Sequence, residues 1–183
     1  MNFFSMSFLI ERILKYQSII NQKMNKLFIF TLALFSMQLV VSQEINQVTK
    51  DARGREMMLG EITKEGFTSN SFNSWFSTNY EAYEPDAIIT KKLQRKLKKY
   101  NITIFMGTWC GDSKREVPKF YKVLEAANFP ANKLRIIGLN NARSAYKQGP
   151  NGEEKGLNIH RVPTFIVYNK KGKEIGRIVE HPV

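Results

Sequence analysis

The sequence has very few residues that can bind metals or act as nucleophiles: one cysteine, Cys110, and two histidines among 183 residues. One cysteine excludes an intramolecular disulfide. Together with two histidines it cannot supply the four ligands of a closed structural zinc site. The sequence also lacks a glycine-rich phosphate loop and a Ser/His/Asp series. We therefore expect no metal and no cofactor, and any covalent chemistry has to use Cys110.

Acidic residues are scarce relative to basic ones. The chain has 16 Asp and Glu against 28 Lys and Arg, which gives a formal net charge of +12. A strongly basic chain can bind nucleic acid or an anionic surface. No nucleic-acid-binding motif accompanies the charge, however, and many of the lysines fall together at residues 91–99. We interpret them as a solvated helix face and expect no nucleic-acid partner.

A membrane-spanning helix needs about 20 apolar residues, and no apolar run in this sequence is that long. The apolar residues 27–41 follow Asn25-Lys26, which supplies the positive charge of Lys26. Small residues, Val40 and Ser42, occupy positions −3 and −1 of a predicted cleavage site. This pattern is typical of a secretory signal peptide. An uncleaved N-terminal anchor is the alternative. We expect a periplasmic or extracellular protein with no stable membrane insertion after cleavage.

The leader also sets the predicted domain boundaries. Residues 1–42 are interpreted as leader and signal peptide, with Met24 as the true start, because signal peptides seldom carry so long a segment ahead of their charged region. Residues 43–86 are interpreted as an N-terminal extension. Residues 87–183 are interpreted as the folded domain.

An apolar stretch leads directly into Cys110. Residues 102–107 are apolar nearly throughout, which favours a strand covered on both faces, and a helical pattern starts near Ser113. Cys110 therefore lies at a helix N-terminus, where unpaired N–H groups and the helix dipole favour an anion. This position favours the thiolate, the nucleophilic form of cysteine. We expect Trp109 to shield the sulfur in part and to leave one approach open.

The segment after Asp86 predicts a helix with a basic face. Asp86 can cap it, and apolar residues recur at helical spacing at Ile89, Leu93, Leu97 and Tyr100. We expect this stripe to face the core and the intervening lysines and arginines to face solvent.

Other patterns predict an α/β fold around these two segments. The strand–helix–strand order implies that the strands 102–107 and 134–139 are parallel. The polar stretch 140–156 predicts a short helix within an insertion beside the site. The aromatic cluster either forms a binding platform or, as we favour, packs the extension onto the domain; its residues are Trp75, Phe76, Tyr80 and Tyr83. The remaining predicted elements are a strand at 57–62, a helix at 71–76 with Ser71 as its N-cap, a helix from Ser113 to about residue 129, and a hairpin of strands 165–168 and 174–179.

These residues resemble a known family. Trp109-Cys110-Gly111 at the end of a buried strand resembles the active-site turn of thioredoxin-fold proteins. Pro118 stands where thioredoxins carry a helix-kinking proline, and Val162-Pro163-Thr164 resembles the cis-proline signature of the family. The resemblance covers about residues 87–183. It implies an α/β, three-layer sandwich with a central mixed sheet, to which this chain adds an N-terminal extension.

The sequence departs from the family in three places. The resolving cysteine is replaced by Ser113 and the buried acid by Ile104, so a dithiol reductase cycle should not be carried over. The family fold ends with a helix, whereas this sequence stops at Val183. We expect a truncated chain; coverage of that face by the extension is the alternative.

The resemblance implies a set of site residues. Ser113 is expected to donate a hydrogen bond to the thiolate, and Asp112 to oppose thiolate formation if it lies close. His160 is either a proton donor or an ordinary surface residue. The predicted catalytic residues are Cys110, Ser113, Trp109 and Pro163, and the predicted substrate-binding residues are Gly111, Asp112, Val162, Thr164 and His160.

Two functions follow from this site. The first is a monothiol thiol–disulfide oxidoreductase or isomerase that acts through mixed disulfides of Cys110. Its partners would be exported proteins with thiols or disulfides, and a low-molecular-weight thiol or an upstream reductase. The second is a redox-inactive thioredoxin-like module that binds an extended peptide. The Trp-Cys-Gly turn favours the first, and Ser113 and Ile104 favour the second.

Overall fold

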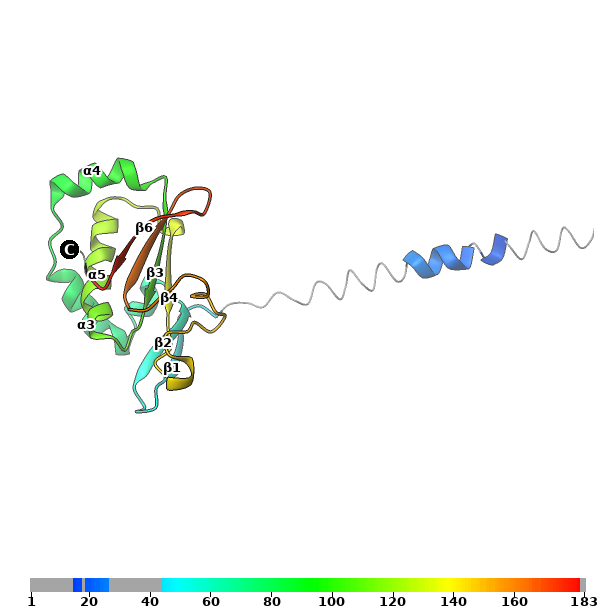
Figure 1. Ribbon diagram of the computed structural model, residues 1–183, viewed down its shortest axis with the longest axis horizontal. Helices are drawn as coiled ribbons and strands as arrows, with labels where there is room; N and C mark the ends of the chain where they lie inside the picture. The colour runs from blue at the N-terminus through cyan, green and yellow to red at the C-terminus, as the bar shows by residue number, and fades with distance from the viewer. Residues whose placement is uncertain (1–14, 18, 27–43, 182–183) are drawn as a thin grey trace, which may run out of the picture. The chain divides into compact units, whose positions relative to one another are not determined.

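The structure is a computed structural model that describes residues 15–17, 19–26 and 44–181. The chain divides into two units, residues 1–42 and 43–183. In the first unit, the described residues are helical and exposed (Figure 1). The predicted signal peptide at 27–41 and its cleavage site lie outside the described residues. No helix within the described part of the chain is long and apolar enough to cross a bilayer.

A six-stranded mixed sheet forms the centre of the second unit (Figure 1). Its strand order is β1-β2-β4-β3-β5-β6. The two central strands, β3 and β4, are parallel, and all other neighbours are antiparallel. The predicted parallel pair and the predicted C-terminal hairpin are both confirmed. The strands are β1 (Gln47–Lys50), β2 (Glu56–Glu61), β3 (Asn101–Met106), β4 (Leu134–Gly138), β5 (Thr164–Tyr168) and β6 (Glu174–Val179).

Two helices, α3 and α5, cover one face of this sheet (Figure 1). Because side chains alternate along a strand, Ile102, Ile104 and Met106 of β3 all point to this face, where they pack with Val117 and Leu124 of α5. The helices are α2 (Lys64–Phe67), α3 (Asn70–Glu81), α4 (Ala87–Leu97) and α5 (Gly111–Ala126), with 3₁₀ turns η1 (Ala131–Lys133) and η2 (Arg143–Ala145).

The opposite face of the sheet is covered by the long connection from β4 to β5. Phe105 and Ile166 point to this side, and Leu157 and Ile159 of the connection pack against them. The short helix predicted in residues 140–156 is the 3₁₀ turn η2. The result is a three-layer α/β arrangement with a central mixed sheet, as predicted.

Residues 43–86 contribute two strands and two helices to the second unit. The ring of Phe76 stacks on Phe67 at 4.9 Å and meets the ring of Tyr121 of α5 edge-on at 6.0 Å. Phe76 is only 2% exposed, so the packing interpretation of this aromatic cluster is confirmed. The N-cap of α3 is Ser69, and the prediction of Ser71 was wrong, because the helix starts two residues before its apolar pattern. Strand β1 was not predicted.

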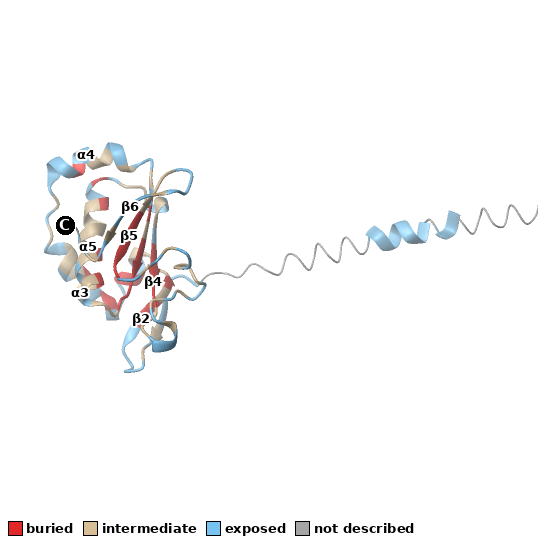
Figure 2. Cartoon of the chain, viewed as in Figure 1, coloured by how far each residue is buried: buried red, intermediate tan, exposed pale blue. Residues whose placement is uncertain are grey.

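Helix α4 is capped as predicted but packs differently. Asp86 Oδ1 accepts hydrogen bonds from the backbone N–H groups of Ile88, at 2.8 Å, and Ile89, at 2.9 Å. Only Thr90 is buried in this helix, however, and Ile89 is 54% exposed (Figure 2). The prediction that Ile89 faces the core was wrong. Helical spacing shows which residues share a face, and it does not show whether another element covers that face.

Candidate active site

The strand β3 leads through a tight turn into α5, and Cys110 is the residue at the junction. Its backbone N–H donates to the Gly107 carbonyl at 2.8 Å, and its own carbonyl accepts from the Lys114 N–H at 3.0 Å. Cys110 is the N-cap of α5, with φ −88° and ψ 130°. The helix begins at Gly111, two residues before the predicted start at Ser113.

The sulfur of Cys110 faces the segment that enters β5. Its side chain is half-buried, and the thiol donates a hydrogen bond to the Val162 carbonyl over 3.3 Å. The Val162–Pro163 peptide bond is cis. The Cys110 side chain makes no capping hydrogen bond to α5. The sulfur therefore lies beside the helix N-terminus and is directed at the carbonyl oxygen of Val162.

Trp109 is fixed between the turn and the end of β4. Its indole Nε1 donates to the Leu139 carbonyl at 2.8 Å, and its ring lies directly over Gly107. On its outer side it meets the ring of Tyr146, with centroids 5.6 Å apart. Trp109 and Cys110 both border the apolar cluster on the face opposite α5. The ring therefore forms one wall next to the sulfur.

The hydroxyl of Ser113 stabilises the turn through a hydrogen bond to its backbone. Ser113 is fully buried, and its Oγ accepts the Gly107 N–H at 3.2 Å. No hydrogen bond between Ser113 and the Cys110 sulfur is found among the described residues, whereas the sequence predicted one to the thiolate. Ile104 is also fully buried, on the α5 side of the sheet. No acidic side chain therefore occupies that position.

A second hydroxyl, that of Thr108, ties the turn to the neighbouring hairpin. Thr108 is 1% exposed, and its Oγ1 accepts the N–H of Met58 in β2 at 3.0 Å. Because both groups are buried, each would be left unpaired without the other. The turn is thus held by hydrogen bonds that involve the side chains of Ser113, Thr108 and Trp109.

The other predicted residues lie around this turn in different settings. The Asp112 carboxylate is paired with Arg115 at 2.7 Å. The hydrogen bonds that the Arg115 guanidinium donates to Glu116 and then to Asp112 raise the pKa of that guanidinium. Gly111 is exposed, and Thr164 is buried, with its hydroxyl donating to the Arg161 carbonyl at 2.7 Å.

His160 is exposed, and its carbonyl oxygen accepts a hydrogen bond from Lys147 Nζ. No hydrogen bond or ion pair of the imidazole is present among residues 44–181. Pro163 is buried, and its carbonyl accepts from the Glu180 N–H at 2.7 Å. The structure thus brings Cys110, Trp109, Val162 and Pro163 together, while His160 lies at the surface of the same segment.

Two further features bear on the chemistry. Within the described residues, no group of three or more His, Cys, Asp or Glu side chains could hold a metal ion. An apolar cavity of about 180 Å³ lies between α5 and the β5–β6 pair, lined in part by Phe120, Val123, Phe165 and Ile178. Its lining includes none of the predicted site residues. Neither feature adds a residue to the group around Cys110.

Sequence reasoning missed three residues that shape the site. Leu139 and Met58 contribute backbone groups, which no sequence pattern reveals. Tyr146 contributes its ring, and it is 53% exposed within a polar stretch. An aromatic residue in an otherwise polar insertion beside the site was the available signal for Tyr146.

The sequence profile of the thioredoxin family matches residues 70–183, more than half of the chain. The chain belongs to the thioredoxin family. A search of curated protein sequences found no match. Two of the solved structures that this thioredoxin-family chain resembles illustrate the likeness. A protein of unknown function from Pseudomonas aeruginosa aligns with 16% identity and a TM-score of 0.44, over 60% of this chain and 64% of that one.

Mitochondrial thioredoxin 3 from Saccharomyces cerevisiae, in its oxidised form, aligns with 21% identity and a TM-score of 0.32, over 55% of this chain and 86% of that one. The chain thus spans somewhat less than two thirds of the Pseudomonas protein. The family assignment rests on the sequence profile, and the fold described above agrees with it.

Proposed function

We propose that this protein catalyses thiol–disulfide exchange, as a monothiol oxidoreductase or isomerase that acts on exported proteins. The observation that carries the proposal is the position of one half-buried sulfur at the N-cap of α5, beside the carbonyl of Val162. In a thioredoxin-family fold, this is where a nucleophile and a substrate backbone would meet. The helix N-terminus favours negative charge on the sulfur once its proton has left.

The exchange takes place in two balanced steps. The Cys110 thiolate attacks one sulfur of a substrate disulfide; a new S–S bond forms, the old one breaks, and the second substrate sulfur leaves as a thiolate that takes up a proton. A second thiolate then attacks the mixed disulfide and releases Cys110 as a thiolate. If the attacking thiolate belongs to the substrate, the result is isomerisation. If it belongs to a small thiol, the product is a mixed disulfide between that thiol and the substrate. A second small thiol then attacks this bond, so the substrate ends as two thiols and the two small thiols end as one disulfide.

The absence of a second cysteine determines which reactions are favoured. The chain has one cysteine, so Cys110 cannot store a disulfide within the protein. Net oxidation of substrates is therefore disfavoured, and isomerisation or reduction with an external thiol is favoured. The external thiol is a low-molecular-weight thiol or an upstream reductase.

The neighbours of the sulfur suggest how a substrate would be held. The N–H of Val162 donates to no group among the described residues, and in this proposal it pairs with a substrate backbone beside the sulfur. Trp109 and Pro163 would flank an extended segment, and Gly111, which carries no side chain, leaves the helix end open. The leader sequence supports export, and the substrates are then exported proteins with thiols or disulfides.

A specific observation favours a second function, a redox-inactive module that binds an extended peptide. The thiol donates to the Val162 carbonyl, and the Ser113 hydroxyl accepts the Gly107 N–H. Both side chains are thus engaged within the protein. In this alternative the Val162 edge binds a peptide strand without any covalent step.

The test compares the reactivity of Cys110 in the folded protein with that of a peptide of residues 107–114. Both are reacted with 5,5′-dithiobis(2-nitrobenzoic acid) at pH 7, and the mixed disulfide is then released with glutathione. The proposal expects the folded protein to react at least about tenfold faster than the peptide, because a helix N-terminus promotes the thiolate. A folded thiol that reacts more slowly than the peptide would overturn it and favour the binding module. Cys110→Ser serves as the blank.

A further inference from the structure

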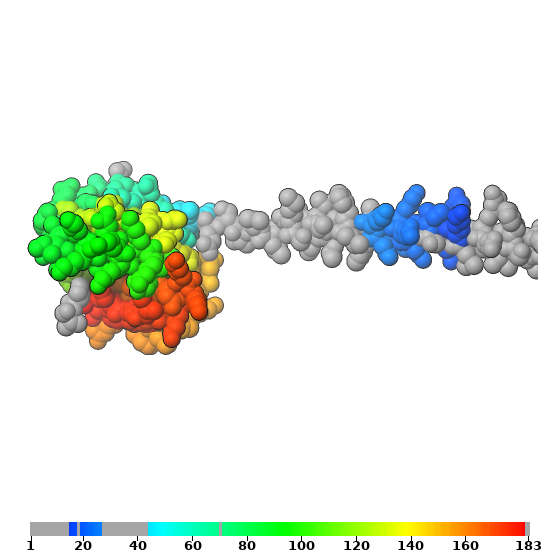
Figure 3. Space-filling model, turned by 90° about the horizontal axis from the view of Figure 1, so that it is seen from above, coloured from blue at the N-terminus to red at the C-terminus, as the bar shows by residue number. Residues whose placement is uncertain are grey.

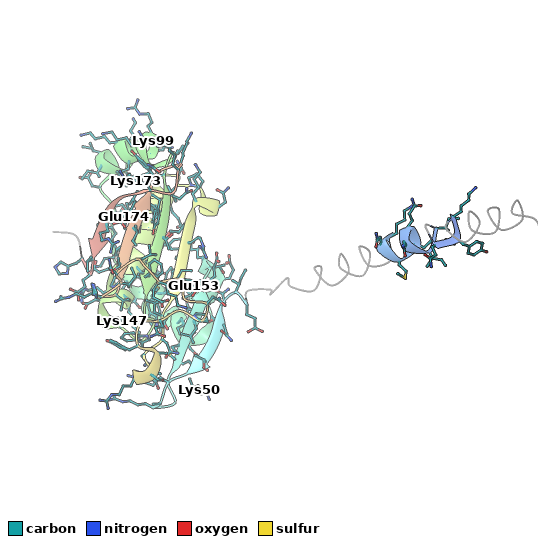
Figure 4. The ribbon with its side chains drawn as sticks, turned by 45° about the vertical axis from the view of Figure 1, so that its right-hand side comes forward. Lys50, Lys99, Lys147, Glu153, Lys173 and Glu174 are labelled. Carbon is teal, nitrogen blue, oxygen red and sulfur yellow. The ribbon has the colours of Figure 1, made fainter. Side chains whose placement is uncertain are left out.

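One end of the second unit carries a dense group of cations. They come from two segments, α4 with its following turn and the tip of the β5–β6 hairpin. Asn101 pairs with Tyr168, which brings the start of β3 and the hairpin to the same end of the sheet. Figure 4 shows Lys99 and Lys173 at this end, and Figure 3 shows α4 in green beside the orange-red hairpin. We call the following exposed residues the cationic end: Lys91, Lys92, Arg95, Lys96, Lys98, Lys99, Lys170, Lys171 and Lys173.

The charge of the cationic end is not neutralised by the protein. None of its side chains forms an ion pair within residues 44–181. The nearby acids have other roles: Asp86 caps α4, and Glu174 pairs with Arg177 at 2.6 Å. Like charges four residues apart, such as Lys91 and Arg95, destabilise a helix. The cations therefore do not serve the stability of α4.

Two large apolar side chains are exposed next to these cations. Ile88 is 69% exposed and Ile89 is 54% exposed, both in the first turn of α4. Because successive helical residues are turned by about 100°, Ile88 shares one face with Lys91, Lys92 and Arg95. An isoleucine left in water among cations gains nothing from the fold. It gains free energy when it enters an apolar layer that lies behind a layer of negative charge.

We propose that the cationic end, together with Ile88 and Ile89, binds the surface of an anionic phospholipid bilayer. Lysines and arginines near such a surface are attracted to its negative potential, and apolar side chains of a surface helix enter the headgroup region. A nucleic acid would also attract the cations, but it offers no apolar layer for the two isoleucines. This inference does not depend on the chemistry of Cys110.

The binding mode has a consequence for orientation. Cys110 follows the C-terminal end of β3, and the cationic end lies at its N-terminal end. A six-residue strand spans about 20 Å, so roughly the length of β3 separates the cationic end from the turn that carries the sulfur. The Cys110 turn then faces away from the lipid, toward partners in solution.

The test measures co-sedimentation of the full chain with vesicles of phosphatidylglycerol and phosphatidylcholine, and with pure phosphatidylcholine vesicles. The apolar residues 27–41 are common to every variant, so the comparison uses the gain on anionic over neutral vesicles. The variant is Lys91→Gln, Lys92→Gln, Arg95→Gln. The matched control is Lys50→Gln, Arg53→Gln, Lys155→Gln, the same charge change among exposed residues outside the cationic end. Figure 4 shows Lys50 at the opposite end of the unit.

We expect binding at least about tenfold weaker for the α4 variant and little change for the control, because each cation near the surface contributes separately. A second variant, Ile88→Ser with Ile89→Ser, is expected to retain binding at low salt and to lose it sooner as salt is raised. Circular dichroism checks that all variants fold.

Three results would overturn the proposal. One is equal binding of the parent chain to anionic and neutral vesicles. Another is an equal loss in the α4 variant and the control, which would mean that only net charge matters. The third is displacement from vesicles by single-stranded DNA together with an isoleucine variant whose salt dependence matches that of the parent, which would assign the surface to nucleic acid.

Discussion

The contact between Gly107 and Trp109 allows a sharp test of how the Cys110 turn is held. A Cβ atom added at Gly107 would lie 2.5 Å from Trp109 Cε2 and 2.8 Å from Nε1. Such distances are far below van der Waals contact, so Gly107→Ala has to displace the indole. The indole in turn is bonded to the Leu139 carbonyl at 2.8 Å. The substitution therefore acts on the ring and on its hydrogen bond together.

The expected magnitude follows from these two effects. Overpacking a well-filled site costs about 1–3 kcal/mol. Leaving the buried Leu139 carbonyl without its donor costs about 1–3 kcal/mol more if the indole moves away. Replacing glycine by alanine also stabilises the folded state by about 0.4–1 kcal/mol, because it lowers the conformational entropy of the unfolded chain. We expect Gly107→Ala to lower the free energy of unfolding by about 1–5 kcal/mol.

The assay is urea denaturation followed by circular dichroism, with tryptophan emission recorded in parallel. Gly111→Ala is the matched control. It lies on the other side of Cys110, no atom lies within 4 Å of its added Cβ, and it is the first residue of α5. We expect it to be neutral or to stabilise by up to about 1 kcal/mol. Equal midpoints for the two variants would refute the role given to the Gly107–Trp109 contact.

Three further predictions concern stability. Phe76→Ala should lower the free energy of unfolding by about 3–5 kcal/mol, because a buried ring leaves a cavity, whereas exposed Ile88→Ala should change it by less than about 0.5 kcal/mol; similar urea midpoints would contradict this. Thr108→Val should cost about 1–3 kcal/mol, because the Met58 N–H loses its acceptor; an unchanged midpoint would argue against that bond. Hydrogen bonds from the backbone and side chain of its hairpin turn hold the pKa of Asp51 well below its usual range. Its stabilising contribution is therefore full above about pH 4 and is lost as the pH falls further, so the urea midpoints of the parent and Asp51→Asn should differ at pH 7 and converge toward pH 2.

The strands and the Cys110 turn were predictable because their patterns are local. β3, β4 and β5 are apolar runs bounded by turn residues, and the helix after Cys110 has a clear apolar stripe. β1 was missed because it lies at the sheet edge and its side chains are largely exposed, so it carries no burial pattern. α4 was found as a helix, but the exposure of its first turn depends on which elements lie next to it. Sequence alone does not hold that information.

The site was predictable in its residues and not in its bonds. Cys110, Trp109 and Pro163 were identified from the resemblance, and the structure brings them together. The contacts that hold them use the backbone of Gly107, Leu139 and Val162, and any residue type has such groups. The hydroxyl of Ser113 was assigned to the sulfur, but in the fold the Gly107 N–H reaches it. Which of two nearby partners a hydroxyl takes depends on positions that only the folded chain defines.

The hydrogen bond from Met58 to Thr108 decides where this chain can be shortened safely. The family profile begins at residue 70, so a fragment cut at that boundary would contain Cys110 and yet lack β1 and β2. Such a fragment leaves β4 as a bare edge strand, whose unpaired N–H and carbonyl groups can recruit strands of other molecules. It also opens the buried hydroxyl of Thr108 to water. A fragment meant to report on Cys110 therefore has to retain the hairpin of residues 47–61, or its aggregation will be mistaken for a property of the thiol.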